Sequence, residues 1–93
     1  MGRAVYKVKG GKMIKVQLDQ KEGKIKKVKI MGDFFLHPED LIEEMEKALT
    51  GSPVNEENIR ILIDNFLSER GGVLLGASSS DIAKCIVMAG DQE

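Results

Sequence analysis

Residues 13–19 read Met-Ile-Lys-Val-Gln-Leu-Asp, and this stretch decides the fold. Its apolar residues Ile14, Val16 and Leu18 share one parity, and its polar residues share the other. Because successive side chains of a strand point to opposite faces, this period of two predicts a strand. One face of that strand is expected to be buried and the other to lie in water.

A strand is also expected on the N-terminal side of this stretch. Ala4, Tyr6 and Val8 share one parity there, and Gly10-Gly11 follows. Glycine reaches positive φ without a steric cost, so this pair predicts a tight turn between the two strands.

A third strand is expected from Lys24 to Met31, after a turn at Lys21-Glu22-Gly23. Val28 and Ile30 share one face of it, whereas Ile25 has the opposite parity, which indicates a bulge or a twist near the start of the strand. Residues 3–31 are therefore expected to form an antiparallel β meander with one buried face.

The period becomes helical after residues 32–33. His37-Pro38-Glu39-Asp40 predicts a helix start with Pro38 at the first helical position, and Thr50-Gly51 predicts its end. Asn55 is expected to cap a second helix that ends at Gly71-Gly72. Ser78, three residues before Asp81, has the spacing of a capping box and predicts a last helix. Residues 38–89 are thus the helical part. Between the last two helices, Val73-Leu74-Leu75 is either a short strand or an extended link, and we favour the link.

Strands followed by helices predict an α+β fold: a three-stranded antiparallel meander followed by two to three helices packed on one face. The 93 residues fit one domain, and 42% apolar with 31% charged residues is a globular composition, not a disordered or fibrous one. The apolar runs are too short for a transmembrane helix. A single cysteine excludes an internal disulfide, so a reducing, cytoplasmic setting is expected.

Residues with catalytic chemistry are sparse. His37 is the only histidine and is expected to serve in capping or surface packing. Cys85 lies on an apolar helix stripe and is expected to be a buried, inert thiol. The stretch 71–78 leads into a helix N-terminus that could bind an anion, although a plain cap is favoured. We expect no catalytic residue and no metal site.

Charge is divided unevenly along the chain. Residues 1–31 carry a net charge of +8 and residues 32–93 a net charge of −9. The meander places lysines on its outer face: Lys7, Lys9, Lys15, Lys27 and Lys29. This face is either simply solvated, which discourages edge-to-edge pairing, or a docking surface for an acidic partner. Nucleic acid is a third reading, but the face lacks interleaved aromatic residues for base stacking.

The order of motifs resembles that of a known module. Gly23-x-Ile25 is followed by Gly32-Asp33-Phe34-Phe35, a helix, Leu49-x-Gly51, a second helix and a glycine-bearing link into a last helix. Over residues 4–89 this order is similar to that of the small C-terminal, accessory domain of lipoate–protein ligases. The large domain's Arg-Arg-x-Ser/Thr-Gly-Gly-Gly signature and its catalytic lysine have no counterpart here.

The resemblance implies an accessory subunit of a split ligase. In that family the large domain binds lipoate and ATP, forms lipoyl-adenylate and transfers the lipoyl group to a carrier-domain lysine, and the small domain assists adenylation. This chain would then have no cofactor of its own and no catalysis alone, and would form a heterodimer with the larger catalytic subunit. The expected partner interface comprises Lys15, Lys27, Lys29, Asp33 and Phe35. A nucleic-acid-binding module and a homodimeric scaffold are the alternatives.

Overall fold

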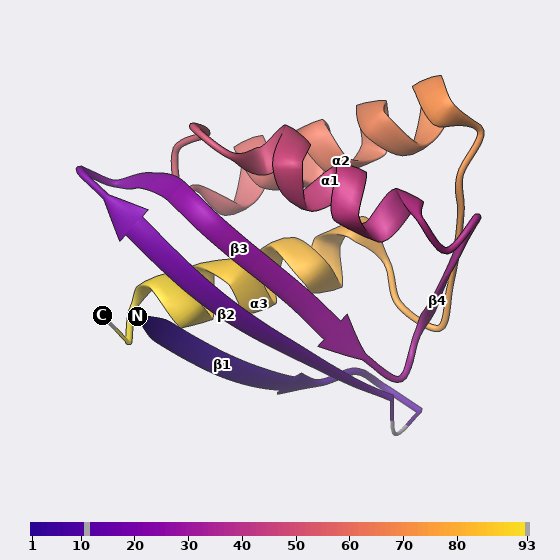
Figure 1. The fold of residues 1–93 in the computed structure, drawn as a ribbon. Coiled ribbons are helices and arrows are strands. Elements are labelled where there is room, and N and C mark those ends of the chain that lie inside the picture. Colours follow the sequence, from indigo (N-terminus) through magenta and orange to yellow (C-terminus); the bar gives the residue numbers. More distant parts are fainter. Residues whose placement is uncertain (11, 93) are drawn as a thin grey trace.

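The computed structural model describes residues 1–10 and 12–92. The three longest strands come first: β1 (Gly2–Lys7), β2 (Met13–Lys21) and β3 (Lys24–Gly32). They are followed by the short strand β4 (Phe35–His37), helix α1 (Leu41–Leu49), helix α2 (Glu56–Arg70), the short strand β5 (Val73–Leu75) and helix α3 (Ser79–Gly90). The α+β fold class is confirmed (Figure 1).

The meander is a three-stranded antiparallel sheet in the order β1-β2-β3. Val16 lies at its centre, paired with Ala4 on one side and Ile30 on the other. The register between β2 and β3 shifts after Asp19, and this irregularity brings Ile25 to the inner face, where it is buried. The irregularity near the start of β3 that the parity of Ile25 indicated is therefore confirmed.

All three described helices cover the same face of this sheet, and the other face is open (Figure 1). Helix α3 packs on β1 and β2, α1 packs on β3, and α2 contacts both other helices. The core between the layers is apolar, and no polar or charged side chain is buried in the described part of the chain. Its largest fully buried side chains include Ile14, Leu18, Met45, Ile63 and Ile86.

The expected caps of the last two helices are present. The Asn55 side chain accepts a hydrogen bond from the Asn58 N–H at the start of α2. Gly71 ends that helix in the left-handed conformation, with φ 63° and ψ 29°. At α3, the Ser78 side chain accepts from the Asp81 N–H and the Asp81 carboxylate accepts from the Ser78 N–H.

Two expectations were wrong. Val73–Leu75 is the strand β5, not a link, because it pairs antiparallel with β4, a strand the sequence did not reveal. Each of these strands has only three residues, too few to show a period of two. Pro38 is not the first residue of a helix, since His37 belongs to β4 and α1 begins only at Leu41 after Asp40.

No helix in the described ranges is long and apolar enough to cross a membrane.

Candidate partner-docking surfaces

The open face of the sheet carries the expected lysines. Lys15, Lys27 and Lys29 are exposed there, with Lys29 paired across from Gln17 and Lys27 across from Asp19. Lys15 lies opposite Met31, so it is a diagonal neighbour of Lys29 on the same face. The strands thus bring these three predicted interface residues together.

Two details of this face differ from or add to the expectation. Lys9 lies in the turn after β1 rather than on the sheet, because β1 ends at Lys7. Arg3 joins the face, opposite Gln17.

Tyr6 belongs to the inner parity, paired with Ile14, and the Lys84 ammonium lies 5.0 Å from the centroid of its ring. Among the described residues, the outer face of the three strands therefore carries no aromatic ring on which a base could stack.

Asp33 and Phe35 lie beyond the end of β3, where the chain leaves the sheet for the helical layer (Figure 1). Gly32 permits this turn, because its φ is 154° and a Cβ at this position would collide with the Met13 carbonyl oxygen. The Asp33 N–H then donates to that same oxygen at 2.8 Å. Phe34 packs partly against the core, whereas Phe35 is 69% exposed.

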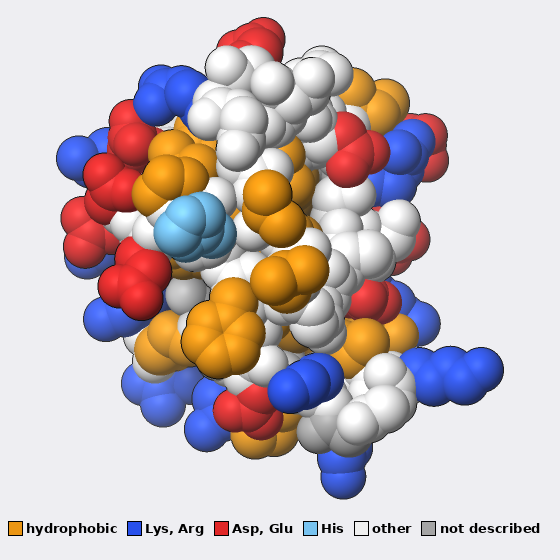
Figure 2. All heavy atoms as spheres, turned by 90° about the vertical axis from the view of Figure 1, so that its right-hand side faces the viewer, with side chains coloured by type: hydrophobic (Ala, Val, Ile, Leu, Met, Phe, Trp, Pro, Cys, Tyr) orange, Lys and Arg blue, Asp and Glu red, His pale blue; other side chains and the backbone are white. Residues whose placement is uncertain are grey.

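The two-stranded ribbon of β4 and β5 has an apolar surface that is exposed to solvent. The sequence did not predict this surface. Phe35 pairs with Leu75 and His37 pairs with Val73. Leu75 is 57% exposed and Val73 is 48% exposed, while the intervening Leu36 is buried at 6%. We name Phe35, Val73 and Leu75 the ribbon patch; Figure 2 shows hydrophobic side chains gathered beside the single histidine on this side of the molecule. Only the pairing of β4 with β5 creates the patch, so no local pattern could have shown it.

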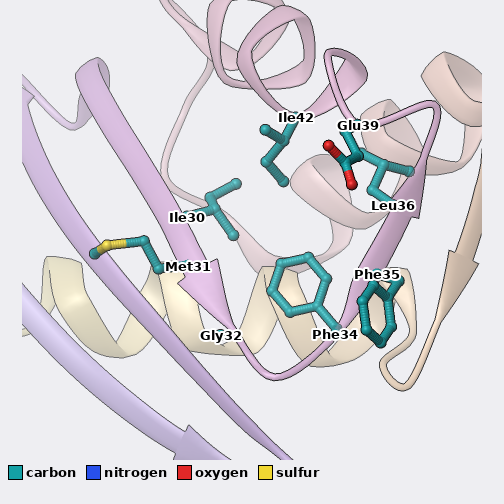
Figure 3. Close-up of a pocket in the computed structure, with 8 residues that line it drawn as sticks. All are labelled: Ile30, Met31, Gly32, Phe34, Phe35, Leu36, Glu39 and Ile42. Atoms are coloured by element: carbon teal, nitrogen blue, oxygen red, sulfur yellow. The ribbon is translucent and has the colours of Figure 1, made fainter.

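A cavity of about 230 Å³ adjoins the ribbon patch. The side chains that line it are apolar except for that of Glu39, which precedes α1, and the Glu39 carboxylate lies between Ile42 and Leu36 in Figure 3. No ion pair in the described part of the chain involves Glu39. The cavity is lined by Ile30, Met31, Gly32, Phe34, Phe35, Leu36, Glu39 and Ile42.

The remaining candidate residues behave as structural groups. Cys85 is buried, as expected, and burial raises the pKa of its thiol to about 11. A backbone hydrogen bond at Tyr6 lowers this pKa, but by less than burial raises it. The N-terminus of α3 is occupied by its own capping box, so the plain cap expected for residues 71–78 is confirmed. His37 is exposed on β4. Within the described ranges, no group of three or more His, Cys, Asp or Glu residues could hold a metal ion.

The sequence of this chain matches a known family. Residues 6–86 match the family model described as the C-terminus of bacterial lipoate protein ligase. The chain belongs to this family. The order of motifs from Gly23 to the last helix had indicated the same family, and that identification is confirmed.

A curated protein and a solved structure that resemble this lipoate protein ligase C-terminus both come from Thermoplasma acidophilum. The chain is 36% identical over 81 residues to lipoate-protein ligase A subunit 2, covering 87% of this chain and 82% of that protein. It also matches a chain of a solved archaeal lipoylation system, described as a bi-partite lipoate protein ligase and its E2 lipoyl domain. That match has a TM-score of 0.76 and 33% identity, and covers 90% of this chain and 91% of the other.

Proposed function

We propose that this chain is the accessory subunit of a bipartite lipoate–protein ligase. The observation that carries the proposal is its similarity to a protein named as a second subunit, over 82% of that protein's length. Because the match covers most of that relative's length, the relative is itself a small separate chain and not a large ligase with an added domain. The fold match, which covers 91% of a chain from a bi-partite ligase, supports the same conclusion.

In this proposal the larger, catalytic subunit binds lipoate and ATP. A carboxylate oxygen of lipoate bonds to the α-phosphorus of ATP, and pyrophosphate leaves with the electron pair of the broken bond. The developing charge is stabilised more strongly where water is excluded. A small subunit that closes over the site can exclude water without supplying a reacting group, which is the role we assign to this chain. We also place the pair in the cytoplasm, because a chain with a single cysteine fits a reducing compartment.

The proposed interface with the catalytic subunit uses the surfaces that the core leaves free. One is the lysine face, with Lys15, Lys27 and Lys29, and the other is the corner formed by Asp33 and Phe35. All five residues are exposed, although the backbone N–H of Asp33 is engaged in its hydrogen bond to the Met13 carbonyl oxygen. A contact between separate chains must supply its own affinity, so an interface of about 1,200–2,000 Å² in total is expected. Charges at its rim are expected to act mainly on the association rate.

Mixing the two purified subunits tests this proposal. Size-exclusion chromatography at micromolar concentration should show a one-to-one complex, and lipoate-dependent ATP–pyrophosphate exchange by this chain alone should remain at background. Separate elution of the two proteins, or exchange well above background without the larger subunit, would contradict the accessory role.

The nucleic-acid alternative finds no support. The lysine face would give electrostatic attraction, but its described residues offer no stacking platform, and residues 32–93 carry a net charge of −9.

A further inference from the structure

We infer that the ribbon patch and the cavity beside it form the anchor for the catalytic subunit, and that this subunit fills the cavity with a lysine or arginine side chain. The inference rests on the proposed function and deepens it, since it names the chemistry that the partner brings. It also separates the two surfaces of the proposed interface: the ribbon holds the partner, and the lysine face only steers it.

The ribbon patch has the properties of an interface centre. Three of the six large apolar residues that are exposed in the described chain, Phe35, Val73 and Leu75, lie together on this two-stranded ribbon. Its opposite side is held down by the buried Leu36 and the partly buried Leu74, so the patch is displayed on a fixed support. Aromatic residues and depletion of charge mark the buried centre of protein interfaces, and binding energy concentrates there.

The Glu39 carboxylate decides what the partner must carry. It shares the cavity with Phe35, so a protein that covers Phe35 also removes water from Glu39. Burying an unpaired carboxylate is strongly unfavourable, whereas a carboxylate paired with a cation and hydrogen-bonded is tolerated. Because no described residue pairs with Glu39, the partner has to supply the positive charge.

The apolar wall selects a long aliphatic cation. Lysine and arginine pack their methylene stems on apolar surface and keep the charge at the tip. The Phe34 ring, Ile42 and Leu36 would contact such a stem, and Glu39 lies where the charged tip would end (Figure 3). Arginine fits best, because its planar guanidinium can pair with a carboxylate through two hydrogen bonds and stack on a neighbouring ring.

A second copy of this chain fits the surface less well. A two-fold symmetric contact uses the same patch on both molecules. It would bring two Glu39 carboxylates into one interface, and the ribbon patch of Phe35, Val73 and Leu75 offers them no positive side chain. Charge complementarity therefore favours the catalytic subunit over self-association.

The test measures the dissociation constant of the chain with the purified catalytic subunit of the same organism, by calorimetry. Phe35→Ala and Glu39→Gln should each raise it about 30-fold or more, mainly through faster dissociation. Matched controls on α2, Ile61→Ala and Glu69→Gln, replace another exposed apolar residue and another exposed carboxylate, and should stay within twofold of wild type. Melting curves of each free variant check that the fold is intact.

The outcomes separate this inference from the proposed function. If the wild-type pair forms a complex and supports exchange while Phe35→Ala and Glu39→Gln bind within twofold of wild type, the anchor is elsewhere and only this inference is overturned. If the wild-type chain forms a homodimer that Phe35→Ala dissociates, the occupant is a second copy and the inference is also overturned. If the wild-type pair neither binds nor supports exchange, the proposed function itself fails.

Discussion

Truncation of two phenylalanines should separate a docking residue from a core residue. Phe35 is 69% exposed, whereas Phe66 is only 8% exposed and packs in the core. If a phenylalanine presents about 200 Å², the buried third of Phe35 covers about 60 Å², worth about 1.5 kcal/mol at about 25 cal/mol per Å². Phe66→Ala removes a buried ring and leaves a cavity, which costs about 3–5 kcal/mol.

Circular dichroism followed during heating and during urea titration measures both losses. For a domain of this size each kcal/mol shifts Tm by about 4–8 °C, so Phe35→Ala should lower Tm by at most about 6–12 °C. Phe66→Ala should lower it by at least about 12 °C or prevent folding. An equal loss of free energy of unfolding in the two variants would refute the assignment of Phe35 to the surface, and with it the use of Phe35 as an anchor.

Four further measurements test other residues of the structure. Because burial raises the pKa of the Cys85 thiol to about 11, the native thiol should react slowly with a disulfide reagent at pH 8 and quickly in urea. Between pH 9 and pH 11 the unfolded thiol ionises while the native thiol stays protonated, so the free energy of unfolding should fall as pH rises. The fall should be smaller in Cys85→Ala, which has no thiol to ionise. An equal dependence of the free energy of unfolding on pH in the two proteins would contradict this. Ser78→Ala removes the acceptor of the capping box and should lower the free energy of unfolding by about 1 kcal/mol in urea titration, whereas exposed Ser68→Ala should not. The double variant with Lys15→Glu and Lys27→Glu should associate more slowly with the catalytic subunit, and its association rate should depend less on salt. Lipoyl-adenylate formation by the pair should fall as well. An unchanged association rate would mean that the lysine face is merely solvated.

The fold could be predicted from the sequence wherever a period repeats often enough to be seen. The alternation of Ile14, Val16 and Leu18 predicted the buried face of β2, and the changed parity of Ile25 predicted the irregularity after Asp19. Local capping chemistry predicted the starts of α2 and α3 from Asn55 and Ser78. In each case neighbouring residues alone carry the physical cause.

The β4–β5 ribbon could not be predicted because its cause is not local. Phe35 and Leu75 are far apart in the sequence, and α1 and α2 lie between the two strands that pair. The ribbon patch and the Glu39 cavity depend on that pairing, so the sequence indicated Phe35 as an interface residue but gave no sign of Val73, Leu75 or Glu39.

We propose that this chain completes a lipoate ligase without catalysing the reaction itself. The most direct test of this claim is lipoate-dependent ATP–pyrophosphate exchange by a fixed amount of the catalytic subunit, measured while this chain is added in steps. We expect little exchange without the chain, a rise in the exchange rate as it is added, and saturation at one molar equivalent. A rate that does not change as the chain is added, or exchange that grows in proportion to this chain in the absence of the larger subunit, would contradict it.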